Sequence, residues 1–411
     1  MPIVGDNMVS VKRKNRSAAL RLLQEEGSMS RKRLAEKLCL TPAAITKIAG
    51  EMLSEGLLRE GNALPSGSAG RREILMELNP HSFCALGVLI NLRQAIITAL
   101  WLDSTVIFAE EVPIPPSAPA DETTAMLAAR LLDLTRRYEL PQDKVIGIGI
   151  AVRGICSSDG RTVVDSFGAL AEKKYPLCRR MEELTGYPAV MANNVRALFS
   201  AQMFRSHDPS TGAQFFVRCE YGIGASLSVN GQIWHGVSEQ CAEIGHIPVI
   251  PRGGKPCSCG KAGCLQTISS PMAICEDART AFSEEKTPLL WSKWKDKDLS
   301  GIQPEDVLEA ARNGDLGAGE IVDRAVSTLG SALKSVIYLF DPGKIILYGR
   351  LFENPYYLSR LLSEMREGVD NHHDVQIEKS AYNQQLETSA AGLLAVDAFF
   401  RNGGEPLRRS C

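Results

Sequence analysis

The sequence contains no uncharged apolar run long enough to cross a bilayer. A membrane-spanning helix needs about 20 consecutive, predominantly apolar residues, and no stretch of the 411 residues provides them. The segment from Met1 to Ser10 also lacks the basic start and the apolar stretch of a secretory signal. These two absences predict a cytoplasmic protein without a membrane partner.

The chain also has little net charge, at -2 for 46 basic and 48 acidic residues. The charge is unevenly divided, because residues 1–80 hold thirteen Lys or Arg against nine Asp or Glu (+4), whereas residues 81–411 hold 33 against 39 (-6). A DNA-reading end joined to an ordinary domain shows this asymmetry, although a solvated basic helix face gives the same difference.

A disulfide scaffold is not expected, although the chain has 11 cysteines. A chain of this length, with 44% apolar residues, is expected to form about two or three compact units with cores of their own. Disulfide frameworks are typical of small secreted domains instead. Most of the cysteines stand alone in the sequence, and we interpret these as ordinary thiols: Cys39, Cys84, Cys156, Cys178, Cys219, Cys241, Cys275 and Cys411.

The apolar periodicity near the N-terminus predicts three short helices. The first ends at Gly27, the second begins at the capping residue Ser30, and Thr41-Pro42 supplies the cap and first position of the third. The third helix turns four short or polar residues outward, namely Ala43, Ala44, Thr46 and Lys47. Because short side chains let a helix enter a major groove, and the threonine and lysine can reach base edges or phosphates, we expect this face to bind DNA.

A strand pair with a flexible loop follows these helices. Residues 58–60 and 71–78 are expected to form two strands, and a Gly/Ser/Pro-rich stretch over residues 61–70 separates them. Arg71 and Arg72 lie at the base of this wing, where they are placed to contact phosphates or a minor groove. Residues 1–80 therefore read as a winged helix-turn-helix domain, with a three-helix protein-interaction module as the alternative.

The rest of the chain has the pattern of an α/β protein. Apolar strands are expected over residues 84–90, 95–101 and 145–152, a helix over residues 123–138, and a Pro/Ala-rich connector over residues 113–120. Two further strands surround the turn at residues 222–225, and Asn230-Gly231 closes a hairpin. A mixed sheet flanked by helices is the expected architecture.

Four metal-binding side chains lie within nineteen residues, on a segment rich in glycine. They are His246, Cys257, Cys259 and Cys264. One imidazole and three thiolates fill the tetrahedral coordination of Zn²⁺ and leave no open position, so we expect one structural zinc ion per chain. The alternatives are metal-free reduced thiols and, less favoured, a redox switch.

This segment resembles the defining motif of the ROK family of repressors and sugar kinases. The resemblance rests on Glu243-Ile244-Gly245-His246 followed by C-x-C-G-x-x-G-C-L at residues 257–265, with further matches at residues 147–152, 184–188, 193–194, 222–225 and 339–342. The Ser30-Arg31 helix and the Gly70-Arg71-Arg72 wing resemble those of the repressor branch. The resemblance covers nearly the whole chain.

The resemblance implies an actin-like fold of two ribonuclease-H-like lobes with a sugar between them, and a homodimer or homotetramer. The effector domain would span residues 81–411. Its first lobe would take about residues 81–192 plus a C-terminal helix at about 385–402, and its second lobe about residues 193–384.

The departures from the family pattern concern catalysis. ROK kinases hold the ATP phosphates on an Asp-x-Gly-Gly-Thr turn, and residues 89–94 of this chain contain no glycine. The catalytic Asn-Asp pair is Asn193-Asn194 here, and an amide cannot act as a general base. The paired glycines of a second nucleotide-contacting loop are also disturbed, as Tyr348-Gly349-Arg350. We therefore expect no enzyme activity.

The most consistent function is a sugar-responsive DNA-binding repressor of carbohydrate-metabolism genes. Ligand would close the two lobes, change the spacing of paired DNA-binding heads and lower the affinity for operator DNA. The alternatives are an ATP-dependent kinase of a hexose and a DNA-tethered structural module without a small-molecule ligand.

The expected ligand site combines retained and altered residues. Asn193, Glu243 and His246 match family positions that contact sugar hydroxyls. Asn194 replaces an aspartate, Gln266 a glutamate and Arg153 a proline, which removes two negative charges and adds one positive. This change predicts an anionic effector, a sugar phosphate or sugar acid. The alternative is drift after the loss of catalysis, with a neutral sugar still bound.

Overall fold

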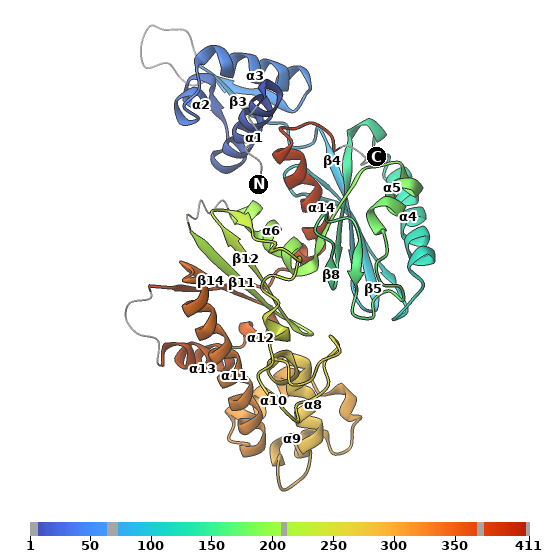
Figure 1. Cartoon of the computed structure of the whole chain (residues 1–411), viewed down its shortest axis with the longest axis vertical. Helices are drawn as coiled ribbons and strands as arrows, with labels where there is room; N and C mark the ends of the chain where they lie inside the picture. The colour runs from blue at the N-terminus through green and yellow to red at the C-terminus, as the bar shows by residue number, and fades with distance from the viewer. Residues whose placement is uncertain (1–6, 64–72, 207–211, 368–373, 408–411) are drawn as a thin grey trace. The chain divides into compact units, whose positions relative to one another are not determined.

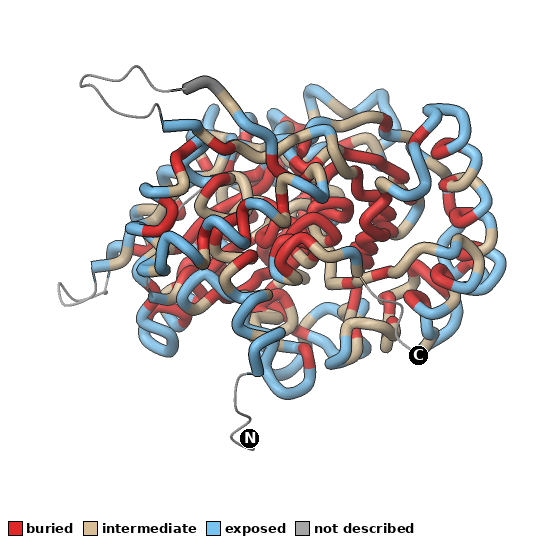
Figure 2. The backbone as a smooth tube through the Cα atoms, turned by 90° about the horizontal axis from the view of Figure 1, so that it is seen from above, coloured by how far each residue is buried: buried red, intermediate tan, exposed pale blue. Residues whose placement is uncertain are grey.

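The computed structural model describes residues 7–63, 73–206, 212–367 and 374–407 (Figure 1). The chain forms two compact units, Met1–His207 with Gln385–Cys411 and Asp208–Gln384. The first boundary lies after helix α6 (Asn194–Ser206), later than the lobe boundary expected near residue 192. Buried residues lie inside and exposed turns outside (Figure 2). None of the helices among the described residues has the length and apolarity needed to cross a membrane.

The first unit begins with a head of three helices and a small antiparallel sheet. The helices are α1 (Met8–Glu26), α2 (Arg31–Lys37) and α3 (Pro42–Ser54), and the strands, in the order β1-β3-β2, are β1 (Met29–Ser30), β2 (Leu58–Ala63) and β3 (Ile74–Leu78). Ser30 and Thr41 cap α2 and α3 through their side-chain oxygens, as the sequence predicted. The head thus has the three helices and the strand pair of a winged helix, and β1 is an addition that the sequence did not indicate.

A five-stranded sheet follows in the order β10-β7-β4-β5-β6. Its strands are β4 (Cys84–Ile90), β5 (Gln94–Trp101), β6 (Val106–Pro113), β7 (Val145–Val152) and β10 (Ala189–Asn193), and a separate two-stranded sheet is formed by β8 (Ile155–Cys156) and β9 (Val163–Asp165). The remaining elements of this unit are α4 (Ala120–Arg137), η1 (Gln142–Lys144), α5 (Leu177–Thr185), α6 and α14 (Gln384–Arg401). β4 and β7 are buried along their whole length, which explains their unbroken apolar sequence.

Helix α14 packs directly on the middle of this sheet, although it comes from the far end of the chain. A β-carbon on Gly149 would lie 1.8 Å from the carbonyl oxygen of Ala391, and one on Gly87 would lie 2.6 Å from the backbone nitrogen of Gly392. The two strand glycines therefore allow the backbones of helix and sheet to touch.

The second unit repeats this strand pairing. Its sheet has the order β13-β12-β11-β14-β15, and in both units three antiparallel strands are extended by two parallel ones. The strands are β11 (Ala213–Cys219), β12 (Ile223–Val229), β13 (Gln232–Ile233), β14 (Lys344–Tyr348) and β15 (Gln376–Ser380). This duplicated pattern is the one expected of two ribonuclease-H-like lobes.

Helices cover the second sheet and extend beyond it. They are η2 (Ile244–His246), α7 (Gln266–Ser269), α8 (Pro271–Ala281), α9 (Pro288–Trp294), η3 (Leu299–Gly301), α10 (Pro304–Arg312), α11 (Leu316–Phe340), α12 (Arg350–Glu353) and α13 (Pro355–Arg366). The long helix α11 packs on α13, α10 and α8, and its buried stripe joins the core formed by β11 and β14. The expected Asn230-Gly231 turn joins β12 to β13, with both residues at positive φ.

Candidate functional site

The outward face of α3 carries the residues predicted to meet DNA. Ala43, Thr46 and Lys47 are exposed and Ala44 is half-buried, while the aliphatic side chains of Ile45 and Ile48 point into the head. The hydroxyl of Thr46 donates to the carbonyl oxygen of Pro42 at 2.7 Å, and the side chain remains exposed. The structure therefore brings these four residues onto one helix face.

One further position belongs to this face and was not predicted. Gly50 is exposed, four residues after Thr46, and an added β-carbon would have no atom within 4 Å. The i, i+3, i+4, i+7 spacing from Ala43 is the signal in the sequence that could have identified it. Because glycine has no side chain, a binding partner can approach the helix backbone closely at this position.

The two strands of the wing pair as the sequence predicted. β2 and β3 run antiparallel, and Arg59 forms an ion pair with Glu77 across them at 2.7 Å. Arg71 and Arg72, the predicted phosphate contacts, lie outside the described residues.

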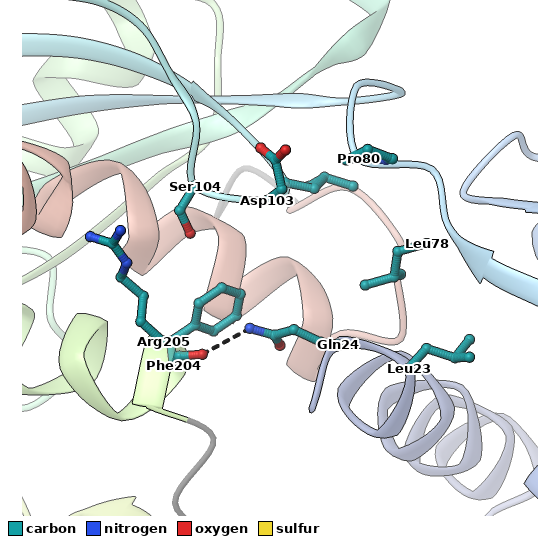
Figure 3. Close-up of a pocket in the computed structure, with 9 residues that line it drawn as sticks. Leu23, Gln24, Leu78, Pro80, Asp103, Ser104, Phe204 and Arg205 are labelled. Carbon is teal, nitrogen blue, oxygen red and sulfur yellow. Dashed lines mark hydrogen bonds between the residues drawn. The ribbon is translucent and has the colours of Figure 1, made fainter. Parts of the chain in front are cut away.

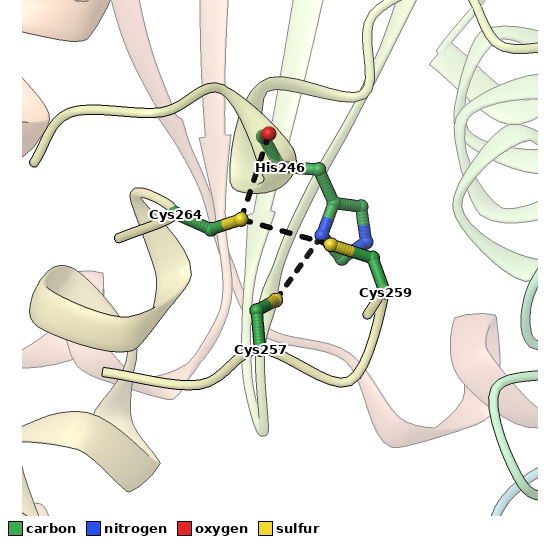
Figure 4. Close-up of side chains that lie close together, drawn as sticks. All are labelled: His246, Cys257, Cys259 and Cys264. Atoms are coloured by element: carbon green, nitrogen blue, oxygen red, sulfur yellow. Dashed lines mark hydrogen bonds between the residues drawn. The ribbon is translucent and has the colours of Figure 1, made fainter. Parts of the chain in front are cut away.

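The predicted metal ligands converge in the second unit. One candidate ligand atom from each of His246, Cys257, Cys259 and Cys264 lies within 4.8 Å of the others, and the side chains point toward one another (Figure 4). The sequence brings them together because residues 255–263 form a tight loop: the amide of Cys257 donates to the carbonyl of Lys261, and that of Gly263 to Lys255.

The spacing of these atoms fits a tetrahedral zinc ion. The sulfurs of Cys259 and Cys264 are 3.7 Å apart, and Cys257 Sγ lies 3.5 Å from His246 Nδ1. Zinc bonds of about 2.3 Å to sulfur and about 2.0 Å to nitrogen require separations of about 3.8 and about 3.5 Å. The arrangement of the four donors is thus compatible with a four-coordinate zinc site.

The thiols differ in acidity. Burial, followed by hydrogen bonds with the neighbouring cysteines, raises the pKa of Cys264 to about 12. Burial also opposes ionisation of Cys257, but hydrogen bonds from the Cys259 backbone and the Gln266 side chain outweigh it and lower the pKa of Cys257. Cys257 is therefore the more readily ionised of the two.

An ion-paired cluster anchors the loop on the helices behind it. Asp277 of α8 is largely buried and accepts from Lys255 and, at 2.6 Å, from Arg324 of α11. Since Lys255 lies two residues before the first cysteine, this cluster fixes the start of the metal-binding loop.

The ligand positions predicted in the second unit lie beside this loop. Glu243 directly precedes the short helix η2, and His246 is its last residue. This helix packs on β12 so closely that a β-carbon on Gly245 would lie 1.9 Å from the carbonyl oxygen of Ile223. Gln266 donates from Nε2 to Cys257 Sγ at 3.1 Å and to Ser258 Oγ at 3.3 Å. Its other amide atom, Oε1, faces Gly222, where a β-carbon would come within 2.8 Å.

The ligand positions predicted in the first unit meet at one edge of its sheet. β4, β7 and β10 are parallel neighbours, so their carboxyl ends lie side by side. Arg153 follows β7, while Asn193 and Asn194 join β10 to α6. The carboxyl edge of parallel strands is where α/β folds bind ligands.

The side chain of Asn193 makes two hydrogen bonds to the backbone at this edge. Its Nδ2 donates to the carbonyl oxygen of Gly154 at 2.6 Å, and its Oδ1 accepts from the amide of Val195 at 2.8 Å. Gly154 has φ +114, and a β-carbon there would lie 2.0 Å from the Asp165 carbonyl oxygen. The asparagine thus starts α6 and holds the turn that carries Arg153.

Comparisons with known proteins agree with this architecture. The ROK family profile matches residues 93–397. The DNA-binding transcriptional dual regulator NagC of Escherichia coli (strain K12) is 28% identical over 348 residues, which cover 84% of this chain and 83% of that protein. The crystal structure of a ROK family transcriptional regulator, a homologue of the E. coli MLC protein, superposes with a TM-score of 0.79 at 24% identity and covers 96% of this chain and 98% of its own.

A kinase is matched less completely. The structure of a ROK family glucokinase from Streptomyces griseus, in complex with glucose and AMPPNP, has a TM-score of 0.62 at 21% identity and covers 98% of its own chain but 77% of this one. The shared fold confirms the α/β class with two ribonuclease-H-like lobes. Because the family profile spans more than half of the sequence, and its defining histidine and cysteines converge in the structure, the chain belongs to the ROK family.

Proposed function

We propose that this ROK protein is a sugar-responsive, DNA-binding transcription repressor of carbohydrate-metabolism genes. The observation that carries the proposal is the exposed face of α3 in the winged head. Ala43, Thr46, Lys47 and Gly50 are exposed on this face, and an added β-carbon on Gly50 would have no atom within 4 Å. Short side chains on the capped third helix suit entry into a major groove. The matches to the regulator NagC and to a ROK transcriptional regulator cover most of this chain and most of each relative, which supports the same function.

A symmetric dimer would place two such heads on a palindromic operator. Half-sites would then be separated by about one helical turn, roughly 34–36 Å, or a multiple of it. The experiment that tests DNA binding is selection of duplexes from a random pool with the full-length protein, followed by footprinting. Enrichment of a palindrome supports the proposal, whereas recovery of no preferred sequence at low salt contradicts it.

The chain acts in this proposal without phosphoryl transfer. The turn between β4 and β5, at residues 91–93, offers no glycine to a phosphate, and Asn194 provides no base. In the second unit, the amide of Arg350 donates to Glu220 at 2.6 Å, and its guanidinium stacks over Tyr382 with 5.1 Å to the ring centre. Glu220 and Arg350 border a cavity of about 280 Å³ next to the altered glycine loop.

An ATP-consumption assay with a panel of hexoses separates the repressor from a kinase. The wild-type protein should consume no ATP above the no-sugar background. The variant Asn194→Asp should also remain inactive, because it restores a base and not the phosphate-binding turn. Sugar-dependent ATP consumption by the wild type would replace the proposal with the kinase function.

Zinc has a structural role in the proposal. His246, Cys257, Cys259 and Cys264 would hold it, and the ion would fix residues 243–266 relative to β12. Because Glu243 and Gln266 lie at the ends of that segment, loss of the metal should disorder half of the proposed ligand site.

The effector is proposed to be an anionic sugar derivative, a sugar phosphate or a sugar acid. Arg153 lies at the carboxyl edge of the first sheet together with the amides Asn193 and Asn194, so this edge combines a positive charge with donors. A guanidinium binds phosphate or carboxylate oxygens in pairs. Drift after the loss of catalysis, with a neutral sugar bound, is the competing explanation.

Calorimetric titration distinguishes these ligands. The wild type and Arg153→Ala would each be titrated with neutral sugars and their anionic derivatives. The ligands are glucose, glucose 6-phosphate, glucuronic acid, N-acetylglucosamine and N-acetylglucosamine 6-phosphate. Tighter binding of an anion, weakened by the substitution, supports the proposal, and a preference for the neutral sugar contradicts it. In either case the bound ligand is proposed to shift the population of DNA-binding conformations.

A further inference from the structure

The last turn of the chain that the structure describes is part of the DNA-binding head. Helix α14 ends at Arg401, and Gly403 and Gly404 follow with φ +71 and +78, both buried. Their amides donate to the carbonyl oxygens of Phe400 and Phe399, which closes the helix. Both glycines lie against α1, so residues from opposite ends of the sequence pack together.

The packing leaves no room for side chains at the two glycines. A β-carbon on Gly403 would lie 3.0 Å from the carbonyl oxygen of Arg13, and one on Gly404 would lie 2.3 Å from Leu57 Cδ2 and 3.2 Å from Leu20 Cδ1. Leu57 and Leu20 belong to the core of the head and are fully buried. The glycine turn therefore fills a socket in the head that is made by α1 and the residue before β2.

One arginine joins this turn to the helix proposed to read DNA. Arg16 of α1 is only 2% exposed. Its Nε donates to the carbonyl oxygen of Gly403 at 2.7 Å, and Nη1 donates to Glu55, directly after α3, at 2.8 Å. A weaker contact of 3.5 Å reaches Glu51, inside the last turns of α3. A single buried guanidinium thus bridges the end of α14 and the end of α3.

Two further bonds attach α1 to the effector domain. Arg21 pairs with Asp397 of α14 at 2.9 Å, and Gln24 Nε2 donates to the carbonyl oxygen of Phe204 in α6 at 2.9 Å. Figure 3 shows the second bond at the border of a cavity of about 270 Å³ lined by Leu23, Leu78 and Ser104, among others.

Helices α6 and α14, which contact α1, are also the helices at which the chain passes between its two units. The chain passes between its two compact units twice, after α6 and at the start of α14. The two helices that hold α1 are therefore the two that continue into the second unit. A movement of that unit acts on α6 and α14 first.

We infer that Arg16 and the Gly403-Gly404 turn form a latch that positions α3, so that helix α14 sets the direction of the DNA-reading face. Arg16 is a positioning residue in this inference, because it lies inside the head and touches no DNA. The inference rests on the proposed DNA-binding function. It predicts that loosening the latch changes the geometry of binding by two heads without unfolding either head.

The test uses full-length protein with three substitutions at the latch and two control substitutions. Arg16→Met removes the donors, Arg16→Lys keeps the charge but cannot span both acceptors, and Gly404→Ala pushes the turn out of its socket. Gly314→Ala is the control for backbone strain, since it has φ +96 in open space within the second unit. Lys14→Met, an exposed residue of α1, is the control for the removal of positive charge.

The first measurement is operator affinity as a function of half-site spacing, on duplexes selected with the wild type. Arg16→Met and Gly404→Ala should lower the preference for the best spacing by about tenfold, because the first removes a buried, paired charge and the second forces the turn out of its socket. Either change leaves the head less firmly oriented. Affinity for a single half-site should stay within about threefold of the wild type. Arg16→Lys should be intermediate, and the two controls should keep the wild-type spacing preference.

The second measurement is hydrogen exchange, which needs no DNA. Arg16→Met should accelerate exchange in residues 402–406 and in the last turn of α3 together, while the core of the second unit is unchanged. Unchanged exchange at residues 402–406, or a wild-type spacing preference in both variants, would overturn the latch. If the wild type selects no duplex, the repressor proposal fails, and the exchange measurement still decides whether the latch exists.

Discussion

Gln266 donates a hydrogen bond from its side-chain nitrogen to the sulfur of Cys257 at 3.1 Å. The bond joins a residue predicted to meet the effector to a residue predicted to hold zinc. Its direction matters, since an amide nitrogen can donate to a thiolate and a carboxylate cannot. A glutamate, which the family pattern usually has here, would place two negative charges side by side.

The first prediction follows from this pair. Gln266→Glu should weaken zinc binding by about 10-fold to 100-fold, the usual effect of losing a partner that orients a metal ligand. The measurement is competition for zinc with a colorimetric chelator. Gln240→Glu makes the same chemical change at an exposed position and should have no effect. Equal zinc affinity in both variants would mean that the bond is incidental.

The second prediction concerns the metal itself. Purified protein should carry about one zinc ion per chain, and Cys259→Ser should lose it, because three donors do not close a tetrahedral site. Metal analysis and thermal unfolding measure both effects, and the variant should unfold at a lower temperature. Cys39→Ser, an exposed thiol in the head, serves as the control and should keep its zinc. Wild-type protein without zinc, prepared without chelator, would remove the proposed role of the four ligands.

The fold was largely predictable where burial follows local rules. β4 and β7 were expected at the residues where they occur, because strands buried on both faces give unbroken apolar runs. The apolar period of Ala18, Leu20, Leu22 and Leu23 predicted only the second half of α1, since the residues of its first half are mostly polar and exposed. Arg16 in that half is buried through a partner 387 positions away, which no local pattern reveals.

The candidate sites divide in the same way. The cluster of candidate metal ligands could be predicted because the spacing of the four residues is local and their chemistry is specific. The hydrogen bond from Gln266 to Cys257 was not, since the sequence resemblance indicated a ligand position and only the folded loop shows where the amide points. The task of Asn193 in holding the Gly154 turn likewise depends on two strands meeting.

The third prediction separates the two proposed DNA-binding elements. Replacing Arg71 and Arg72 by Ala should weaken binding to all sequences and reduce the salt slope by about 0.9 for each phosphate that the protein no longer neutralises. Replacing Thr46 or Lys47 by Ala should instead change the preferred bases. Binding titrations at several salt concentrations, on the selected operator and on a scrambled duplex, measure both. A salt slope that does not change in the double variant would count against the wing.

The last prediction uses Gly50, where stability and function should move in opposite directions. Alanine is favoured over glycine inside a helix by about 0.5–1 kcal/mol, and the added methyl at this position meets no atom within 4 Å. Gly50→Ala should therefore raise the unfolding temperature of the head. If the bare backbone of α3 approaches a base or phosphate, the same methyl should lower operator affinity by about tenfold, or about 1.4 kcal/mol.

Gly319→Ala in α11 is the matched control, since it lies in open space on a helix of the second unit and should add stability without changing DNA binding. Thermal unfolding and operator titration of the two variants measure the change in stability and the change in DNA affinity. A Gly50→Ala protein that is more stable and binds operator as tightly as the wild type would show that DNA does not approach this part of α3, and DNA binding would then be confined to the first turn around Ala43.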